Sequence, residues 1–142
     1  MKNRIIFIAL CIAAITFACK KDYEKKMSAT YPISGDWSVI YTLRGTPDGP
    51  YILSTYNTSF GGADTVWIND NGNFREFTVK AKANVPNRTF EINRGIDIWH
   101  NDTTTIMNGR IINNDSIHFL LMFASLPGDT FIVAGHRRTG FE

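Results

Sequence analysis

The chain has 142 residues and a formal net charge of +2, and 44% of its residues are hydrophobic and 13% aromatic. This length suits one domain with a hydrophobic core and makes a second domain unexpected. The nearly balanced charge gives no electrostatic footprint for nucleic acid, so no nucleic-acid partner is expected.

The first 18 residues have the features of a cleaved export signal. Lys2 and Arg4 precede the apolar run Ile5–Phe17, which is shorter than the about 20 residues that a membrane-spanning helix needs. A small residue and then Cys19 follow this run, so we predict a lipoprotein signal peptide over residues 1–18 and a diacylglyceryl anchor on Cys19. An ordinary secretory signal, cut near the same place without lipidation, is the alternative.

The anchor predicts the location of the protein. Two acyl chains, at about 0.8 kcal/mol per buried methylene, would hold it on a membrane. We expect the cell envelope and its outer membrane, with the periplasmic side and the cell surface both open. Cleavage would also remove Cys11, Lys2 and Arg4, which leaves 13 basic and 13 acidic side chains. Because Cys19 would carry the lipid, no thiol would remain for a disulfide or a metal.

Residues 19–30 are predicted to be the lipidated cysteine and a flexible tether. Most side chains from Lys20 to Lys26 are charged, and the segment offers too little apolar surface to pack. The folded domain is therefore expected over residues 31–142.

Short segments rich in aromatic and β-branched residues make up this domain, and turn residues separate them. The spacings leave no room for helices between the segments, and Gly95 disfavours a helix in the longest connection, Arg94–Asp102. These features predict that successive strands form hairpins. The eight expected strands are Asp36–Leu43, Tyr51–Asn57, Thr65–Ile68, Phe74–Ala81, Thr89–Asn93, Thr104–Ile112, Ser116–Ser125 and Thr130–Arg138.

The predicted fold is all-β, a single up-and-down antiparallel barrel of about eight strands. Closure would bury the edges of successive strands, and a barrel of this size holds side chains or one small ligand. The last two strands are apolar on both faces, so a cover over their outer face is expected. A two-sheet sandwich is the alternative.

Two motifs at the ends of the domain resemble the calycin pattern of lipocalins and fatty-acid-binding proteins. They are Gly35-Asp36-Trp37 and the arginines of the last strand, Arg137 and Arg138. In that pattern the tryptophan plugs one end of the barrel and an arginine packs over its indole, as a cation favours an electron-rich ring. The resemblance therefore implies a plug made by Trp37 with Arg137 or Arg138.

A wider set of motifs is similar to the lipocalin-like "lipid-binding putative hydrolase" family of Bacteroidetes lipoproteins. The similarity extends from Gly35 to Phe141 and implies an anchored calycin-type barrel. The motifs are Tyr56-Asn57-Thr58, Val66-Trp67-Ile68, Asn108-Gly109-Arg110-Ile111-Ile112, Asp115-Ser116-Ile117 and Gly135-His136-Arg137-Arg138-Thr139-Gly140-Phe141.

Lipid or ester hydrolysis is the third hypothesis. The sequence lacks a Gly-x-Ser-x-Gly elbow. Ser116 and His118 are weak catalytic candidates, because they would share one face of a strand about 6.6 Å apart. The alternative is that Ser116 ends a turn and His118 lies at the barrel rim, and neither has a catalytic role.

No metal or cofactor is expected. His100, His118 and His136 stand 18 residues apart and form no ligand pair on one element. The Asn69–Gly72 segment has the composition of a calcium loop but lacks the later bidentate glutamate, and a hairpin turn explains it.

The leading hypothesis is a binding protein for a small hydrophobic or amphipathic, lipid-like ligand. Arg137 or Arg138 would meet an acidic head group. If the aromatic side chains instead fill a solid core, the barrel becomes an interaction module, with a protein partner or a second copy on strands seven and eight. The predicted wall residues are Tyr41, Tyr56, Trp67, Phe77, Phe119 and Phe123.

Overall fold

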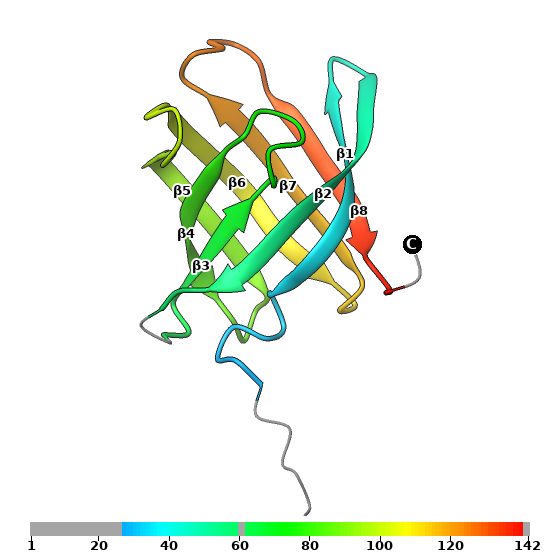
Figure 1. Ribbon diagram of the computed structural model, residues 1–142, viewed down its shortest axis with the longest axis vertical. Helices are drawn as coiled ribbons and strands as arrows, with labels where there is room; N and C mark the ends of the chain where they lie inside the picture. The colour runs from blue at the N-terminus through cyan, green and yellow to red at the C-terminus, as the bar shows by residue number, and fades with distance from the viewer. Residues whose placement is uncertain (1–26, 60–61, 141–142) are drawn as a thin grey trace, which may run out of the picture.

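Eight antiparallel strands in sequential hairpins close into a barrel in the computed structural model, which describes residues 27–59 and 62–140 (Figure 1). The barrel closes because β1 pairs with both β2 and β8. The predicted up-and-down barrel is confirmed and the sandwich alternative is wrong. The strands are β1 Gly35–Leu43, β2 Thr46–Asn57, β3 Thr65–Asn69, β4 Thr78–Asn84, β5 Thr89–Ile96, β6 Thr103–Ile112, β7 Ser116–Phe123 and β8 Phe131–Arg137.

The starts of β2 and β4 differ most from the prediction. The first hairpin turns at Arg44 and Gly45, whose φ angles of 49° and 84° suit a tight two-residue turn, so β2 already begins at Thr46. β4 begins only at Thr78, because Phe74 and its neighbours belong to the β3–β4 loop. The later start of β4 places Phe74 at the end of the barrel and not in its wall.

The two ends of the barrel are unlike. One end, which we name the mouth, carries the β1–β2 turn and the β3–β4, β5–β6 and β7–β8 loops (Figure 1). The other end, the floor, carries the segment that precedes β1 and the turns at residues 85–88 and 113–115. The chain thus enters the barrel on the side opposite the mouth.

Packing at the floor begins before the predicted domain start. Thr30 is fully buried and its Oγ1 lies 2.8 Å from Ser34 Oγ, although residue 30 was predicted to end the tether. Ile33 is also fully buried. The predicted signal peptide and Cys19 lie outside the described residues. No helix within residues 27–59 and 62–140 is long and apolar enough to cross a membrane.

Side chains from alternate strand positions fill the middle of the barrel. On β7, for example, every second residue from Ile117 to Phe123 is buried. On the outer face Leu120 pairs with Ile132 of β8, and the described residues leave Ile132 45% exposed. The buried members of the core at or below 1% exposure include Trp37, Val39, Leu53, Val66, Ile68, Phe77, Val79, Phe119, Leu121 and Val133.

Candidate functional site

The floor is sealed by an indole and a guanidinium. Trp37 is fully buried and its Nε1 donates to Thr55 Oγ1 at 2.9 Å. The Cζ atom of Arg137 lies 4.2 Å from the centroid of the Trp37 ring. Arg137 also donates to the carbonyl oxygens of Ser34, at 2.7 Å, and Asn114, at 2.9 Å. A ligand therefore has to approach from the mouth.

Two hollows flank one aromatic side chain at the mouth. The larger, which we name the rim pocket, has a volume of about 580 Å³. The smaller, the hairpin pocket, has about 480 Å³, and both volumes fall within the range of small-molecule sites. The rim pocket is lined by Phe74, Arg75, Phe77, Asp97, His100, Asn101, Asp102, Phe123 and Ser125, and the hairpin pocket by Tyr41, Leu43, Arg44, Thr46, Pro47, Asp48, Phe74 and Phe131.

Phe74 is the wall that the two pockets share. Its ring stacks on that of Tyr41, with centroids 4.1 Å apart and planes 10° apart. It meets Phe131 edge-on, with centroids 5.2 Å apart. The stacked pair contributes beyond simple burial, at about 0.5–1.5 kcal/mol, and holds Phe74 across the opening.

A buried carboxylate shapes the loop that carries Phe74. Asp70 is fully buried, and its Oδ2 accepts hydrogen bonds from the backbone N–H groups of Phe74, Arg75 and Glu76 at 3.2, 2.8 and 2.8 Å. Its Oδ1 accepts from the N–H of Gly72 at 3.0 Å. Charge-assisted bonds of this kind are stronger than neutral ones, so the β3–β4 loop is held in one conformation.

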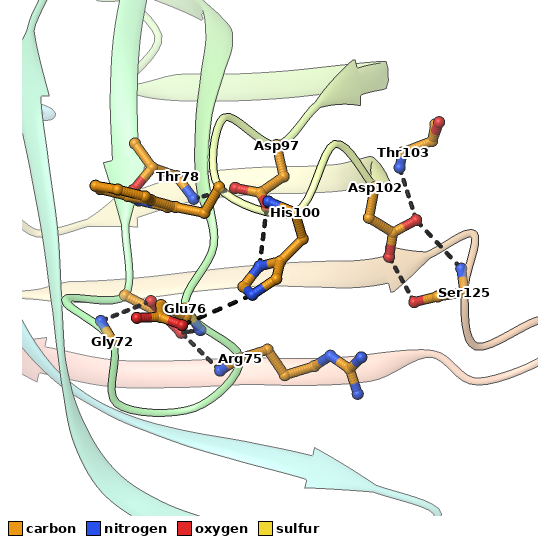
Figure 2. A network of polar contacts seen from close by, with 11 residues as sticks. Gly72, Arg75, Glu76, Thr78, Asp97, His100, Asp102, Thr103 and Ser125 are labelled. Carbon is orange, nitrogen blue, oxygen red and sulfur yellow. Dashed lines mark hydrogen bonds and ion pairs between the residues drawn. The ribbon is translucent and has the colours of Figure 1, made fainter.

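A second buried carboxylate shapes the β5–β6 loop. Asp97 is 2% exposed, and it accepts from the N–H groups of Thr78 and His100, both at 2.7 Å (Figure 2). Burial acts to raise the pKa of the Asp97 carboxyl. Hydrogen bonds from the backbone of Thr78, His100 and Trp99 and from the His100 ring outweigh burial and lower that pKa below its ordinary value.

Polar side chains tie the mouth loops together. Figure 2 shows His100 between two carboxylates, with Nδ1 3.3 Å from Asp97 Oδ2 and Nε2 3.6 Å from Glu76 Oε2. Asp102 accepts from the hydroxyl and the backbone N–H of Ser125, which joins the β5–β6 loop to the β7–β8 loop. The rim pocket is therefore framed by three connected loops.

A cation stands above the apolar base of the rim pocket. The Cζ atom of Arg75 lies 5.1 Å from the centroid of the Phe123 ring. Phe123 packs edge-on against Phe77, with centroids 5.6 Å apart. Aromatic carbon lies below, and the guanidinium at the rim can pair with an acidic group of an amphipathic molecule beside the lining carboxylates Asp97 and Asp102.

The structure brings only part of the predicted wall to this site. Phe77 and Phe123 line the rim pocket and Tyr41 lines the hairpin pocket. Phe119 lies deeper, edge-on to Phe90 with centroids 5.7 Å apart.

The side chains of Tyr56 and Trp67 point away from the barrel interior. They pair across β2 and β3, and Tyr56 is 39% exposed. The neighbours of Trp67 on β3, Val66 and Ile68, are fully buried, so alternation turns Trp67 outward. Their predicted position inside the barrel is wrong, because the inward register of these strands is taken by smaller side chains.

The arginines of the last strand are also far from the mouth. Arg137 covers Trp37 at the floor, and the backbone N–H of Arg138 donates to the carbonyl of Asp36 at 2.8 Å in the same region. Neither is placed to meet a head group at the mouth. Arg75, which the sequence analysis did not single out, is placed there.

Ser116 and His118 lie on the outer face of β7. Ser116 donates to Asp115 Oδ2 at 3.4 Å, while the buried Nδ1 of His118 has no hydrogen-bond partner among the described residues. His118 and Arg110 line a hollow of about 700 Å³ on the outer wall, away from the mouth. In the described part of the chain no hydrogen bond joins Ser116 to His118.

Among the residues placed by the structure, the mouth offers no better pair of nucleophile and base. Ser125 and His100 both line the rim pocket, but Ser125 donates to Asp102 and His100 contacts Asp97 and Glu76. Over the ranges that the structure describes, no three His, Cys, Asp or Glu side chains gather as they would to hold a metal ion.

Three mouth residues escaped the sequence analysis for one reason. Phe74, Arg75 and Glu76 all fall within the predicted strand Phe74–Ala81, whereas in the structure β4 begins only at Thr78. The signal that could have found them is Asp70 followed by Gly72, since an aspartate in a turn accepts hydrogen bonds from the backbone after it.

Comparison with known families gives a match over most of the chain. The family model described as "Lipid-binding putative hydrolase" matches residues 22–142, a range that includes all eight strands. This match confirms the predicted family resemblance. No curated protein matches the chain.

Proposed function

This chain belongs to the lipid-binding putative hydrolase family, and we propose that it binds a small amphipathic, lipid-like molecule in the mouth of its barrel. The observation that carries the proposal is the rim pocket, where Phe77 and Phe123 form an apolar base below the Arg75 guanidinium. Each methylene buried against the rings would contribute about 0.8 kcal/mol. The acidic head group would pair with Arg75.

We further propose that the protein works from a lipid anchor on Cys19 at the cell envelope. The export features of residues 1–18 support this proposal. The position of residues 27–34 also supports it, since they lead into β1 at the floor, on the side of the barrel opposite the mouth (Figure 1). Metabolic labelling with a fatty-acid analogue tests the anchor. Cys19→Ser is expected to lose the label and to leave the membrane fraction.

Titration of the purified, delipidated protein with a fluorescent fatty acid tests ligand binding. We expect saturable binding at one site. Arg75→Ala should weaken it about 5- to 10-fold, since that is the effect of losing about 1 to 1.4 kcal/mol of head-group pairing. Arg110→Ala is the matched control, because Arg110 lies on the outer wall and should leave binding unchanged. An absence of saturable binding by the folded protein would remove the proposal.

A protein-interaction module is the second candidate function. The observation that favours it is an apolar row on the outer wall, in which Leu120 pairs with Met107 on one side and with Ile132 on the other. Met107 is 40% exposed and Ile132 45% exposed. Light scattering after size-exclusion chromatography tests self-association, which Ile132→Lys should abolish.

A further inference from the structure

We propose that Phe74 is a displaceable plug, and that the Tyr41 hydroxyl behind it hydrogen-bonds a neutral polar group on the apolar part of the ligand. The proposal rests on the proposed function and narrows its ligand class. The ligand would be an amphipathic acid that carries a hydroxyl or carbonyl group away from its acidic head.

Tyr41 provides the unexplained polar group. It faces inward from β1 and is 1% exposed, and its hydroxyl has no hydrogen-bond partner among the residues that the structure describes. Buried tyrosine hydroxyls are usually hydrogen-bonded, and an unpartnered one lowers stability. A ligand that reached this depth would supply the missing partner.

The Phe74 side chain lies between the Tyr41 ring and the solvent. It is stacked on Tyr41 and is only half-buried, and it lines both mouth pockets. The loop backbone around it is fixed by the hydrogen bonds to Asp70. Rotation of the Phe74 side chain, without movement of the loop, would join the rim and hairpin pockets and uncover Tyr41.

The surroundings of Tyr41 favour a neutral group over a second acid. Burial, and then the negative charge of Asp70, raise the pKa of Tyr41 well above its ordinary value, so the phenol remains a neutral donor and acceptor. A carboxylate in the same place would be repelled by Asp70. The acidic end of the ligand would therefore stay at the rim with Arg75, where the lining carboxylates Asp97 and Asp102 already accept hydrogen bonds from the protein itself.

A second unpartnered hydroxyl lies at the same end of the barrel interior, on β6. Thr104 is fully buried on β6, and its Oγ1 also lacks a hydrogen-bond partner within the described residues. It pairs across the sheet with Phe123, which lines the rim pocket. Two hydroxyls near the mouth end of the core are consistent with a ligand that is hydroxylated or carbonyl-bearing.

Competition binding with two matched acids tests the role of Tyr41. Dodecanoate and 12-hydroxydodecanoate differ only in the terminal hydroxyl, which normally weakens binding to an apolar pocket. In the wild-type protein the hydroxylated acid should bind about 5-fold more tightly. Tyr41→Phe should remove this preference and raise the melting temperature, because it keeps the ring and deletes the unpartnered hydroxyl.

A rate measurement tests the plug. Phe74→Ala should raise the association rate of 12-hydroxydodecanoate at least 3-fold. Tyr56→Ala is the matched control, because Tyr56 is an aromatic residue on the outer face of β2 that lines neither mouth pocket, and it should leave the rate unchanged. Phe74→Leu, which keeps an apolar side chain, provides a second variant should the alanine variant fold poorly, and a smaller rate increase is expected for it.

The outcomes separate this inference from the proposed function. If the wild-type protein binds neither acid, the proposed function fails. If it binds both but without preference for the hydroxyl, or if Tyr41→Phe keeps that preference, the Tyr41 assignment is overturned. Equal association rates for wild type and both Phe74 variants would overturn the plug.

Discussion

Arg137 and Trp37 stand opposite each other in the β1–β8 ladder that closes the barrel, with the guanidinium carbon 4.2 Å from the centroid of the indole. The two residues are 100 positions apart in the sequence. Their contact therefore joins the first strand to the last and seals the floor in one interaction. The ligand-binding role proposed for the mouth depends on this closed floor.

Loss of the Arg137 side chain should destabilise the fold. Arg137→Ala removes a cation–π contact and two hydrogen bonds to backbone carbonyls, so we expect a loss of about 2 kcal/mol in the free energy of unfolding, measured in urea. Arg137→Lys keeps the charge but lacks the planar guanidinium with its several N–H donors, so we expect about half of that loss in the free energy of unfolding. An unchanged stability in the alanine variant would contradict the structural role of the contact.

Gly35 should be coupled to Arg137. A Cβ atom at position 35 would overlap Arg137 Nη1, so Gly35→Ala must push the guanidinium off the indole. We expect a loss of about 2 kcal/mol in the wild-type background and a smaller loss in Arg137→Ala, where only the strain of an alanine at a φ of 159° remains. A double-mutant cycle in urea measures this coupling. Additive losses would show that the glycine is required for another reason.

Asp97 should make stability depend on acidic pH. Its folded-state pKa lies below the ordinary 3.8, so its contribution is complete above that pH and is lost as the pH falls through the folded value. We expect the free energy of unfolding to fall below about pH 4, and Asp97→Asn to be less stable at neutral pH with a shallower acid slope. Asp115→Asn, at an exposed turn, is the control and should keep the wild-type slope.

Asp70 should determine the rigidity of the β3–β4 loop. Asp70→Asn replaces an acceptor that serves several backbone N–H groups, so we expect a loss of about 2 to 3 kcal/mol in stability. Hydrogen exchange should accelerate at the amides of Phe74, Arg75 and Glu76 and remain slow in the β1–β8 ladder. Acceleration spread evenly over the barrel would show that Asp70 supports the whole fold and not this loop.

The fold was predictable because its signals are local. Short strands separated by turn residues predict sequential hairpins, and the Gly-x-Trp and terminal arginine motifs point to closure. The site was harder to predict, because it depends on register and on loop boundaries. The sequence predicts Trp67 as a wall residue, but in the structure Val66 and Ile68 occupy the inward positions of β3 and Trp67 faces outward. The sequence predicts Phe74 as a strand residue, but its backbone N–H donates to Asp70 and it lies in a loop at the mouth.

A titration of the ¹⁵N-labelled protein with a fatty acid, followed by NMR, tests the central claim most directly. The account predicts saturable shifts that concentrate at Phe74, Arg75, Phe77 and Phe123, with little change around Trp37. Saturable binding with shifts confined to the floor or the outer wall, or no shifts at all, would contradict a ligand site at the mouth.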